Sequence, residues 1–166
     1  TLRVMSLTFS YQDGIEPLNR FVDQIGRPPY SALLYSRLGD LFVEKQRYQD
    51  GAAAYRAFVA REPVNEFSPG LSTQAIEAYR KATSIAPQLG EAWWSLANLK
   101  TFRFAAADLA TMQRQLGRTD LAHDDRFHLH FALGKALEDA QPFEASFPHS
   151  ADANPFRREP IRSPAD

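Results

Sequence analysis

Histidine and acidic side chains, the usual ligands of metal ions, lie close together before one apolar segment of the chain. The group consists of His123, Asp124, Asp125, His128 and His130. Ligands on one helix face need a spacing of three or four residues, whereas His128 and His130 are two apart and point in different directions. Asp124 and His128 have a workable spacing, but the helix dipole also favours acidic residues at a helix start. We therefore expect no metal and no other cofactor.

Catalytic patterns are absent from the sequence. Glu138 and Asp139 are adjacent, so they do not face each other on a helix. The positions of the Ser, His and acidic residues suggest no catalytic triad. The chain has no Cys, which excludes thiol catalysis, disulfides and cysteine-based metal sites. We expect a protein that is not an enzyme.

The composition gives no general attraction to nucleic acid or to anionic membranes. The 166 residues carry a formal net charge of -1, with 44% hydrophobic and 23% charged residues. Arg157, Arg158 and Arg162 form a small basic group without a basic face elsewhere, so we expect no nucleic-acid partner. No apolar run approaches the roughly 18 residues that span a bilayer. We expect no membrane insertion, and a soluble protein of either the cytoplasm or the periplasm.

Apolar residues recur at spacings of three and four, which predicts helices, whereas the alternation typical of strands is scarce. Pro and Gly residues between the apolar segments mark the helix ends. The predicted helices cover residues 15–25, 31–45, 47–61, 69–86, 89–101, 105–116 and 122–140, with a weaker one near 143. Because the connections are short, we expect sequential helices to pack as antiparallel neighbours.

One pair of these helices carries a repeat motif. The matching residues are Tyr35, Leu38, Gly39, Phe42, Tyr55 and Pro63, with Gly51 at a position usually held by alanine. Their spacing follows the pattern of the tetratricopeptide repeat (TPR), which is about 34 residues long. In such a pair Leu38 and Phe42 fill the space between the helices, and Gly39 allows the second helix to approach closely. Tyr55 packs back from the second helix, and Pro63 ends it.

Partial copies of the motif follow with an uneven spacing. The residues at motif positions are Ala75, Tyr79, Pro87, Trp93, Leu96, Leu133 and Gly134. Leu96 lies 58 positions after Leu38, about ten short of two full repeats, and the shortfall falls within residues 63–87. We therefore expect one long helix after Pro69 where a pair of helices would otherwise stand.

The chain thus resembles a TPR protein. This resemblance implies an all-α, TPR-like right-handed solenoid of antiparallel helix pairs over residues 1–153, with a disordered tail over 154–166. Residues 93–153 resemble the TPR region of bacterial TPR–sulfotransferase fusion proteins, through the strings Glu91–Phe104 and Asp125–Asp139. Residues 10–81 are similar to other bacterial TPR proteins, through Leu38–Lys45 and Ala54–Arg61.

The resemblance also implies which residues face a concave binding surface. The expected peptide-binding residues are Asp40, Glu44, Trp94, Asn98, His128, Phe131 and Lys135. Further positions on the same surface are Leu33, Ser36, Val43, Glu91, Thr101, Phe102, Glu138 and Asp139. Asn98 would hold a peptide backbone, with the Trp94 and Phe131 rings as buried anchors. Alternatively, the two rings only pack against the next helix. The carboxylate clamp of chaperone-binding TPR domains is not matched.

We therefore expect a non-catalytic scaffold or adaptor that binds a protein or peptide. An alternative is the substrate-recruiting TPR region of a sulfotransferase without its catalytic domain, because no strand followed by a phosphosulfate-binding loop occurs in the sequence. A third possibility is an architectural role with weak homo-oligomerisation. Pro142 and Pro148 interrupt the last helical segment, which would leave Phe143 and Phe147 exposed.

Overall fold

The computed structural model describes residues 8, 9, 11 and 14–140, and this part of the chain contains helices, turns and loops but no strand. Its helices are α2 (Glu16–Gln24), α3 (Ser31–Glu44), α4 (Tyr48–Arg61), α5 (Ser68–Ile85), α6 (Gly90–Ala97), α7 (Ala106–Leu116) and α8 (His123–Ala140). None of these helices is long and apolar enough to cross a lipid bilayer. The all-α prediction is therefore confirmed for the described residues. The predicted helix near 143 and the tail over 154–166 lie outside them.

The helix boundaries follow from local chemistry. α2 and α5 each have a proline in the first turn, where the missing N–H has no helical partner in any case. α4 and α5 end at Arg61 and Ile85, two residues before Pro63 and Pro87. The single long helix expected after Pro69 is present as α5, which has 18 residues. The prediction over 89–101 was too long, because α6 ends at Ala97.

α3 and α4 form the antiparallel pair that the complete motif predicts. A Cβ atom added at Gly39 would lie 2.3 Å from the Tyr55 ring, and one added at Gly51 would lie 2.8 Å from the Val43 side chain. As the residue number rises along α3, the number of its partner on α4 falls, which establishes the antiparallel direction. Tyr55 Oη also donates a hydrogen bond of 2.8 Å to Asp40. Small residues therefore set the close approach of these two helices.

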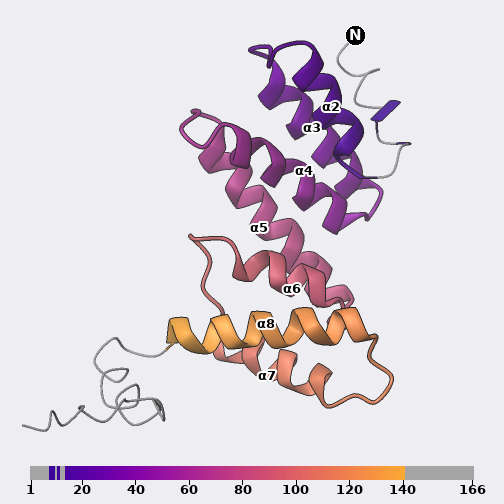
Figure 1. Cartoon of the computed structure of the whole chain (residues 1–166), viewed down its shortest axis with the longest axis vertical. Helices are drawn as coiled ribbons and strands as arrows, with labels where there is room; N and C mark the ends of the chain where they lie inside the picture. The colour runs from indigo at the N-terminus through magenta and orange to yellow at the C-terminus, as the bar shows by residue number, and fades with distance from the viewer. Residues whose placement is uncertain (1–7, 10, 12–13, 141–166) are drawn as a thin grey trace, which may run out of the picture.

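The helices from α3 to α6 pack in the order of the sequence, whereas α6 packs mainly against α8, and α7 also packs against α8 (Figure 1). Gly90 contacts Asp125, the Trp94 and His128 rings lie 5.6 Å apart, and Arg103 is 3.7 Å from Asp139. The partners are 34 to 36 positions apart in each case, so α6 and α8 run in the same direction. Because α6 packs closely against α8 and not against α7, the expectation that sequential helices pack as antiparallel neighbours was wrong for the α6–α7 step.

The short length of α6 gives the physical reason for this arrangement. α6 has eight residues, and residues 98–105 form no helix that would present a second face to α7. Gly90 instead lets the backbone of α8 approach, since a Cβ there would lie 2.2 Å from the Asp125 carbonyl oxygen. The Asp125 carboxylate accepts a hydrogen bond of 2.9 Å from the Gly90 N–H. α8 thus supplies the cap for the start of α6.

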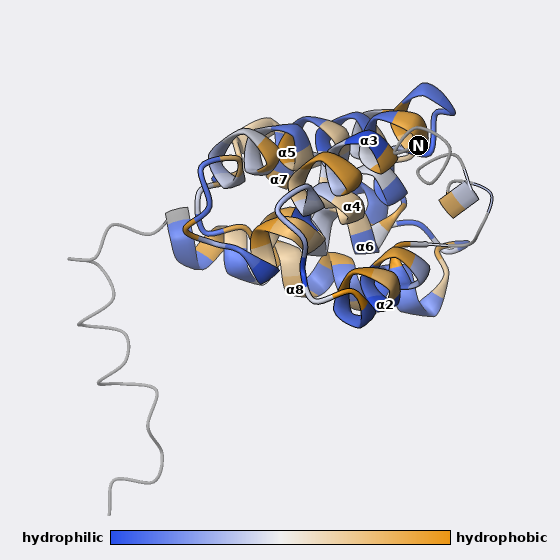
Figure 2. Cartoon of the chain, turned by 90° about the horizontal axis from the view of Figure 1, so that it is seen from above, coloured by the Kyte–Doolittle hydropathy of each residue, from blue (hydrophilic) through white to orange (hydrophobic). Residues whose placement is uncertain are grey.

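Two clusters of buried residues form the core. Each helix carries both hydrophilic and hydrophobic residues (Figure 2), and the buried hydrophobic ones pack against neighbouring helices. The first cluster joins α2 to α6 and includes the motif residues Leu38, Tyr55, Ala75, Tyr79 and Leu96. The second joins α6 to α8 and consists of Trp93, Ala97, Met112, Leu129, Ala132 and Ala136. The apolar motif residues through Leu96 are therefore buried structural residues, whereas Pro63 is exposed and Pro87 is half-buried.

The last copy of the motif does not have the expected register. Leu129, Ala132 and Ala136 are the buried residues of α8, while Leu133 is only partly buried against the second cluster. Apart from Gly134 itself, its two chain neighbours and the adjacent backbone of α8, no described atom lies within 4 Å of a Cβ built at Gly134. Gly134 therefore does not have the packing role of Gly39, because the buried stripe of α8 is set by its parallel contact with α6.

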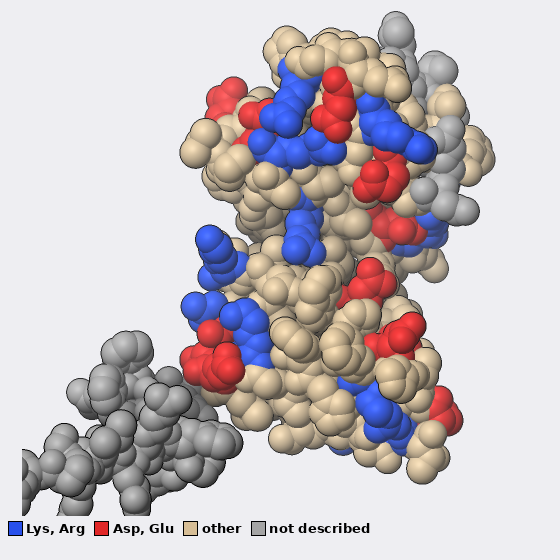
Figure 3. All heavy atoms as spheres, viewed as in Figure 1, with Lys and Arg blue, Asp and Glu red and all other residues tan. Residues whose placement is uncertain are grey.

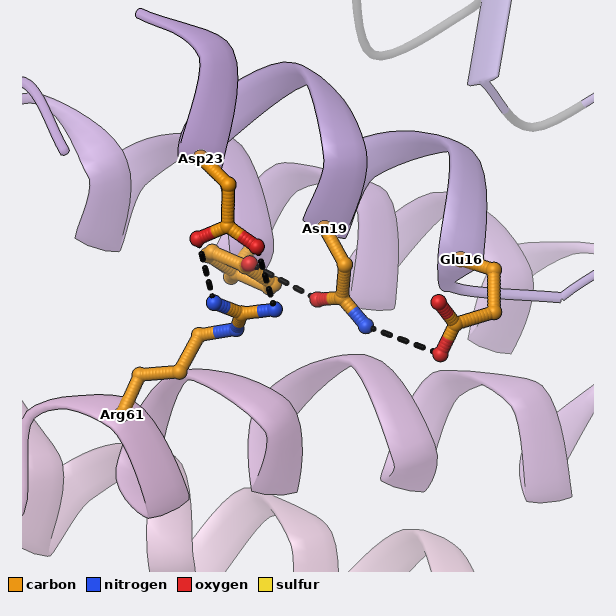
Figure 4. Close-up of polar contacts among 5 residues, drawn as sticks. Glu16, Asn19, Asp23 and Arg61 are labelled. Carbon is orange, nitrogen blue, oxygen red and sulfur yellow. Dashed lines mark hydrogen bonds and ion pairs between the residues drawn. The ribbon is translucent and has the colours of Figure 1, made fainter. Parts of the chain in front are cut away.

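Charged residues of both signs lie beside one another on the face shown in Figure 3, without a broad patch of one sign. A group of charged and polar side chains attaches α2 to the α3–α4 pair (Figure 4). Arg61 of α4 donates two hydrogen bonds, of 2.7 and 3.2 Å, to the Asp23 carboxylate of α2. Tyr35 of α3 donates one of 2.8 Å to Asn19, whose amide donates in turn to Glu16 at 3.2 Å. Leu18 and Val22, each 1% exposed, complete the attachment.

Candidate functional site

A solvent-accessible hollow of about 850 Å³ lies between α3 and α5. Its lining residues are Pro29, Tyr30, Ala32, Leu33, Ser36, Phe67, Gly70, Leu71, Thr73, Gln74 and Glu77. Ala32 and Leu71 are buried and form its floor. Tyr30, Leu33 and Phe67 are large apolar residues that are nevertheless 41%, 44% and 54% exposed. The hollow therefore presents an apolar lining to solvent.

A second hollow, of about 410 Å³, continues the first along the same two helices. Its lining residues are Asp40, Val43, Tyr48, Tyr55, Gln74, Glu77, Ala78 and Lys81, so that the two hollows share Gln74 and Glu77. We call the two hollows together the α3–α5 groove. Residue numbers rise along both helices from the first hollow to the second, and the two walls therefore run in the same direction.

Side-chain spacing explains how each helix forms one wall of the groove. Four residues of α3 line it at intervals of three and four, namely Leu33, Ser36, Asp40 and Val43. Four residues of α5 do the same, namely Gly70, Gln74, Glu77 and Lys81. Residues at such intervals share one face of a helix. Both faces are adjacent to the buried stripes of the same helices, which fix their orientation.

The second hollow contains a buried tyrosine next to two acidic residues. Tyr55 is 3% exposed, and its hydroxyl donates to Asp40 at 2.8 Å. The pKa of Tyr55 is raised, first because burial disfavours the phenolate, and then through the hydrogen bond to Asp40 and the charges of Asp40 and Glu77. Tyr55 therefore stays protonated near neutral pH and holds the Asp40 carboxylate in the groove.

The two carboxylates have no cationic partner within the part of the chain that the structure describes. Neither Asp40 nor Glu77 forms an ion pair there. Lys81 lines the same hollow but does not come within 4 Å of either carboxylate oxygen. The apolar end of the groove is thus followed by an end at which two carboxylates face solvent.

Of the concave-face residues expected in the first copy of the repeat motif, all but one line the groove. Asp40, together with Leu33, Ser36 and Val43, lines the α3–α5 groove. Glu44 is exposed and lines neither hollow. Most of the expected binding face of α3 therefore lines the groove, whereas Glu44, the last residue of α3, lies outside the groove.

Three of the expected residues of the later copies come together on α6 and α8. The Trp94 ring lies 5.6 Å from His128, and Phe127 lies 5.8 Å from His128 and 6.0 Å from Phe131. Phe127 and Phe131 are both 58% exposed. We call Trp94, Phe127, His128 and Phe131 the α6–α8 aromatic cluster. It is a second exposed surface with an apolar character.

Of the other expected residues of the later copies, Asn98, Phe102 and Asp139 make contacts within the chain. The Asn98 amide donates to the Trp94 carbonyl at 2.9 Å, at the end of α6. Lys135 is half-buried on α8, one turn after Phe131. Phe102 lies under the Arg80 guanidinium and 4.9 Å from Phe104, so it packs inside the chain. Glu91, Thr101 and Glu138 are exposed, and Asp139 is near Arg103.

The histidine and acidic residues considered as metal ligands lie in the first turns of α8, and their side chains have different surroundings. The side chains of His123 and Asp124 are 95% and 97% exposed. Asp125 caps α6, and His128 stacks on Trp94. Within residues 14–140 and the few described before them, no three His, Asp or Glu side chains are placed to hold a metal ion together.

The residues that α5 contributes to the groove were not predicted. The sequence assigned only the buried residues Ala75 and Tyr79 of this helix, as the second half of an incomplete repeat. The signal that would have found the groove face is the polar stripe Gly70, Gln74, Glu77 and Lys81, which runs beside the apolar stripe at helical spacing.

Comparisons with known proteins identify no relative: no family model matches the chain, and no curated protein or solved structure does so.

Proposed function

We propose that this chain is a non-catalytic TPR-like scaffold that binds a peptide segment of another protein in the α3–α5 groove. The observation that carries the proposal is the exposure of Tyr30, Leu33 and Phe67 together in one continuous groove. Exposed apolar side chains that are grouped in a hollow and bordered by polar ones are typical of binding surfaces.

The α3–α4 pair supports the TPR-like part of this proposal. Its close contact at Gly39 and its buried Tyr55 are what the complete repeat motif requires. In a TPR-like solenoid the stacked helices twist into a right-handed superhelix with one open face. The parallel walls of the groove agree with that arrangement, in which helices of successive repeats line the face in the same direction.

The length of the groove suits a short peptide. From Leu33 to Val43 the α3 wall spans ten positions, or about 15 Å at about 1.5 Å per residue. An extended chain advances about 3.3 Å per residue, so four or five peptide residues would occupy that length, roughly. The exposed apolar side chains at one end would receive one anchoring side chain.

A selection from a displayed library of random peptides tests the proposal. We expect peptides enriched on the native protein to lose binding to the Leu33→Asp variant, because a carboxylate would occupy the apolar end. The matched control is Phe127→Asp, which changes an exposed apolar residue of α8 outside the groove. We expect this control to bind the peptides normally.

Two results would contradict the assignment of the groove. One is a selection in which no peptide is enriched. The other is a set of peptides that bind Leu33→Asp as well as the native protein and lose binding to Phe127→Asp. The second result would instead place recognition at the α6–α8 aromatic cluster.

A further inference from the structure

We propose that the α3–α5 groove selects an extended peptide in which a large apolar side chain is followed, about three positions away, by Lys or Arg. This inference rests on the proposed function and specifies its ligand. It follows from the different chemistry of the two ends of the groove, which α3 and α5 hold at a fixed separation.

The apolar end would receive the large side chain. Tyr30, Leu33 and Phe67 each expose between 41% and 54% of their surface there. Leu71 beneath them is 4% exposed, so that the floor of this end is also apolar. Removal of these surfaces from water by an aromatic or long aliphatic side chain would favour binding.

The other end would receive a cation. Asp40 and Glu77 line the same hollow, and the charges of both act on the Tyr55 hydroxyl. Neither carboxylate has an ion-pair partner among the described residues, so a Lys or Arg side chain in this hollow would provide one. Tyr55 holds Asp40 by a hydrogen bond, so the carboxylate is already positioned for a ligand.

The spacing of the ligand follows from the helix geometry. Leu33 and Asp40 are seven positions apart on α3, which places them about 10 Å apart along the helix axis. A peptide in the extended polyproline II conformation has about three residues per turn and advances about 3.1 Å per residue, so side chains three positions apart lie on the same side, about 9 Å apart. Lys81 is the one basic residue among the described lining residues of the groove. The groove is therefore poorly suited to an acidic peptide or a terminal carboxylate.

Fluorescence anisotropy with three labelled peptides tests this inference. The peptides share Gly-Ser flanks and contain Trp-Ala-Ala-Lys, Trp-Ala-Ala-Glu or Ser-Ala-Ala-Lys. We expect the first to bind about tenfold more tightly than either of the others, since a charge-assisted contact and an apolar anchor are each worth about that factor. We also expect its affinity to fall as the salt concentration rises.

Matched variants assign the preference to the two carboxylates. In Asp40→Asn and Glu77→Gln we expect the preference for Lys over Glu in the peptide to fall to about threefold or less, because each change removes one of two charges. The amide of Asn can still accept the Tyr55 hydrogen bond, so the fold is kept. Glu44→Gln removes an acidic residue of α3 outside the groove, and its preference should equal that of the native protein.

The outcomes separate this inference from the proposed function. Peptides that need Leu33 but bind equally with Lys or Glu would refute the inference and leave the proposed function intact. The same holds for a preference that Asp40→Asn and Glu77→Gln do not reduce. Library and designed peptides that all bind without Leu33 would refute both proposals. A dimer that Leu33→Asp dissociates, measured by sedimentation velocity, would assign the groove to a second copy of the chain and would also refute both.

Discussion

Replacing Gly39 by alanine tests the contact that joins α3 to α4. The added Cβ atom would lie 2.3 Å from one carbon of the Tyr55 ring and 2.6 and 2.7 Å from two others. Cβ atoms do not come that close to a ring, so Tyr55 has to move. Tyr55 is 3% exposed and donates a hydrogen bond to Asp40. Any displacement of the ring therefore disturbs both core packing and this hydrogen bond.

The expected change in the free energy of unfolding combines one stabilising and two destabilising contributions. Alanine stabilises a helix interior by about 0.5–1 kcal/mol relative to glycine. Overpacking of a core costs about 1–3 kcal/mol. Loss of a hydrogen bond to a charged group costs about 1.5–3 kcal/mol. The costs exceed the gain, and we expect Gly39→Ala to lower the free energy of unfolding by about 2 kcal/mol, which lowers Tm by about 4–8 °C for a chain of this size.

Gly134→Ala is the matched control, because Gly134 is also in a helix interior and carries the same motif position in the sequence. No described atom outside the adjacent part of α8 lies within 4 Å of its added Cβ. We expect this variant to be more stable than the native chain by about 0.5–1 kcal/mol. Thermal and urea unfolding followed by far-UV circular dichroism measure both changes. Equal stability of Gly39→Ala and the native chain, or a loss of stability in Gly134→Ala, would refute this account of the α3–α4 and α8 packing.

The remaining predictions concern the helix ends and the groove. Arg61→Ala should destabilise the chain by about 1 kcal/mol at most, because its ion pair with Asp23 is partly exposed, and hydrogen exchange should become faster in α2 but not in α6–α8. Unchanged exchange in α2 would contradict the role of this pair. Asp125→Ala should cost about 1 kcal/mol through loss of the α6 cap, while Asp124→Ala, at a side chain 97% exposed, should change stability by less than about 0.5 kcal/mol. Equal effects in the unfolding assay would show that Asp125 does not cap α6. In the groove, Leu33→Asp should abolish peptide binding that Phe127→Asp retains, and Asp40→Asn should weaken the preference for a basic peptide.

The helices and the α3–α4 pair were predictable because local signals agree there. Periodicity placed the helices, Pro63 and Pro87 marked where α4 and α5 end, and the motif spacing identified Gly39 and Tyr55 as contact residues. The long α5 was also predicted, from the missing residues in the repeat spacing. These features depend on residues close together in the sequence.

The later part of the chain was less predictable because its packing depends on distant residues. The parallel contact of α6 with α8 is set by Gly90 and Asp125, which are far apart in sequence, and it shifts the buried stripe of α8 away from Gly134. The hydrogen bond from the Asn98 amide to the Trp94 carbonyl at the end of α6 was also not predicted.

The sequence predicted one wall of the candidate groove, which α3 forms, but not the other. The resemblance to the repeat family placed Asp40 on a concave face with Leu33, Ser36 and Val43, and these residues line the groove. The opposite wall was missed because α5 was considered only for its buried residues. Because the repeat that contains α5 has an irregular length, the motif does not assign Glu77 or Lys81 to a binding face. Only the helical spacing of the polar residues in α5 could have placed them there.

Mapping of a bound peptide by two-dimensional NMR shows whether the α3–α5 groove is the surface that binds a peptide. On addition of the Trp-Ala-Ala-Lys peptide to the isotope-labelled protein, we predict that the amide resonances of Leu33, Ser36, Gln74 and Glu77 shift in a saturable manner. Resonances of Trp94, Phe127 and Phe131 should stay in place. Saturable shifts at these three aromatic residues, with none along α3 and α5, would contradict the account.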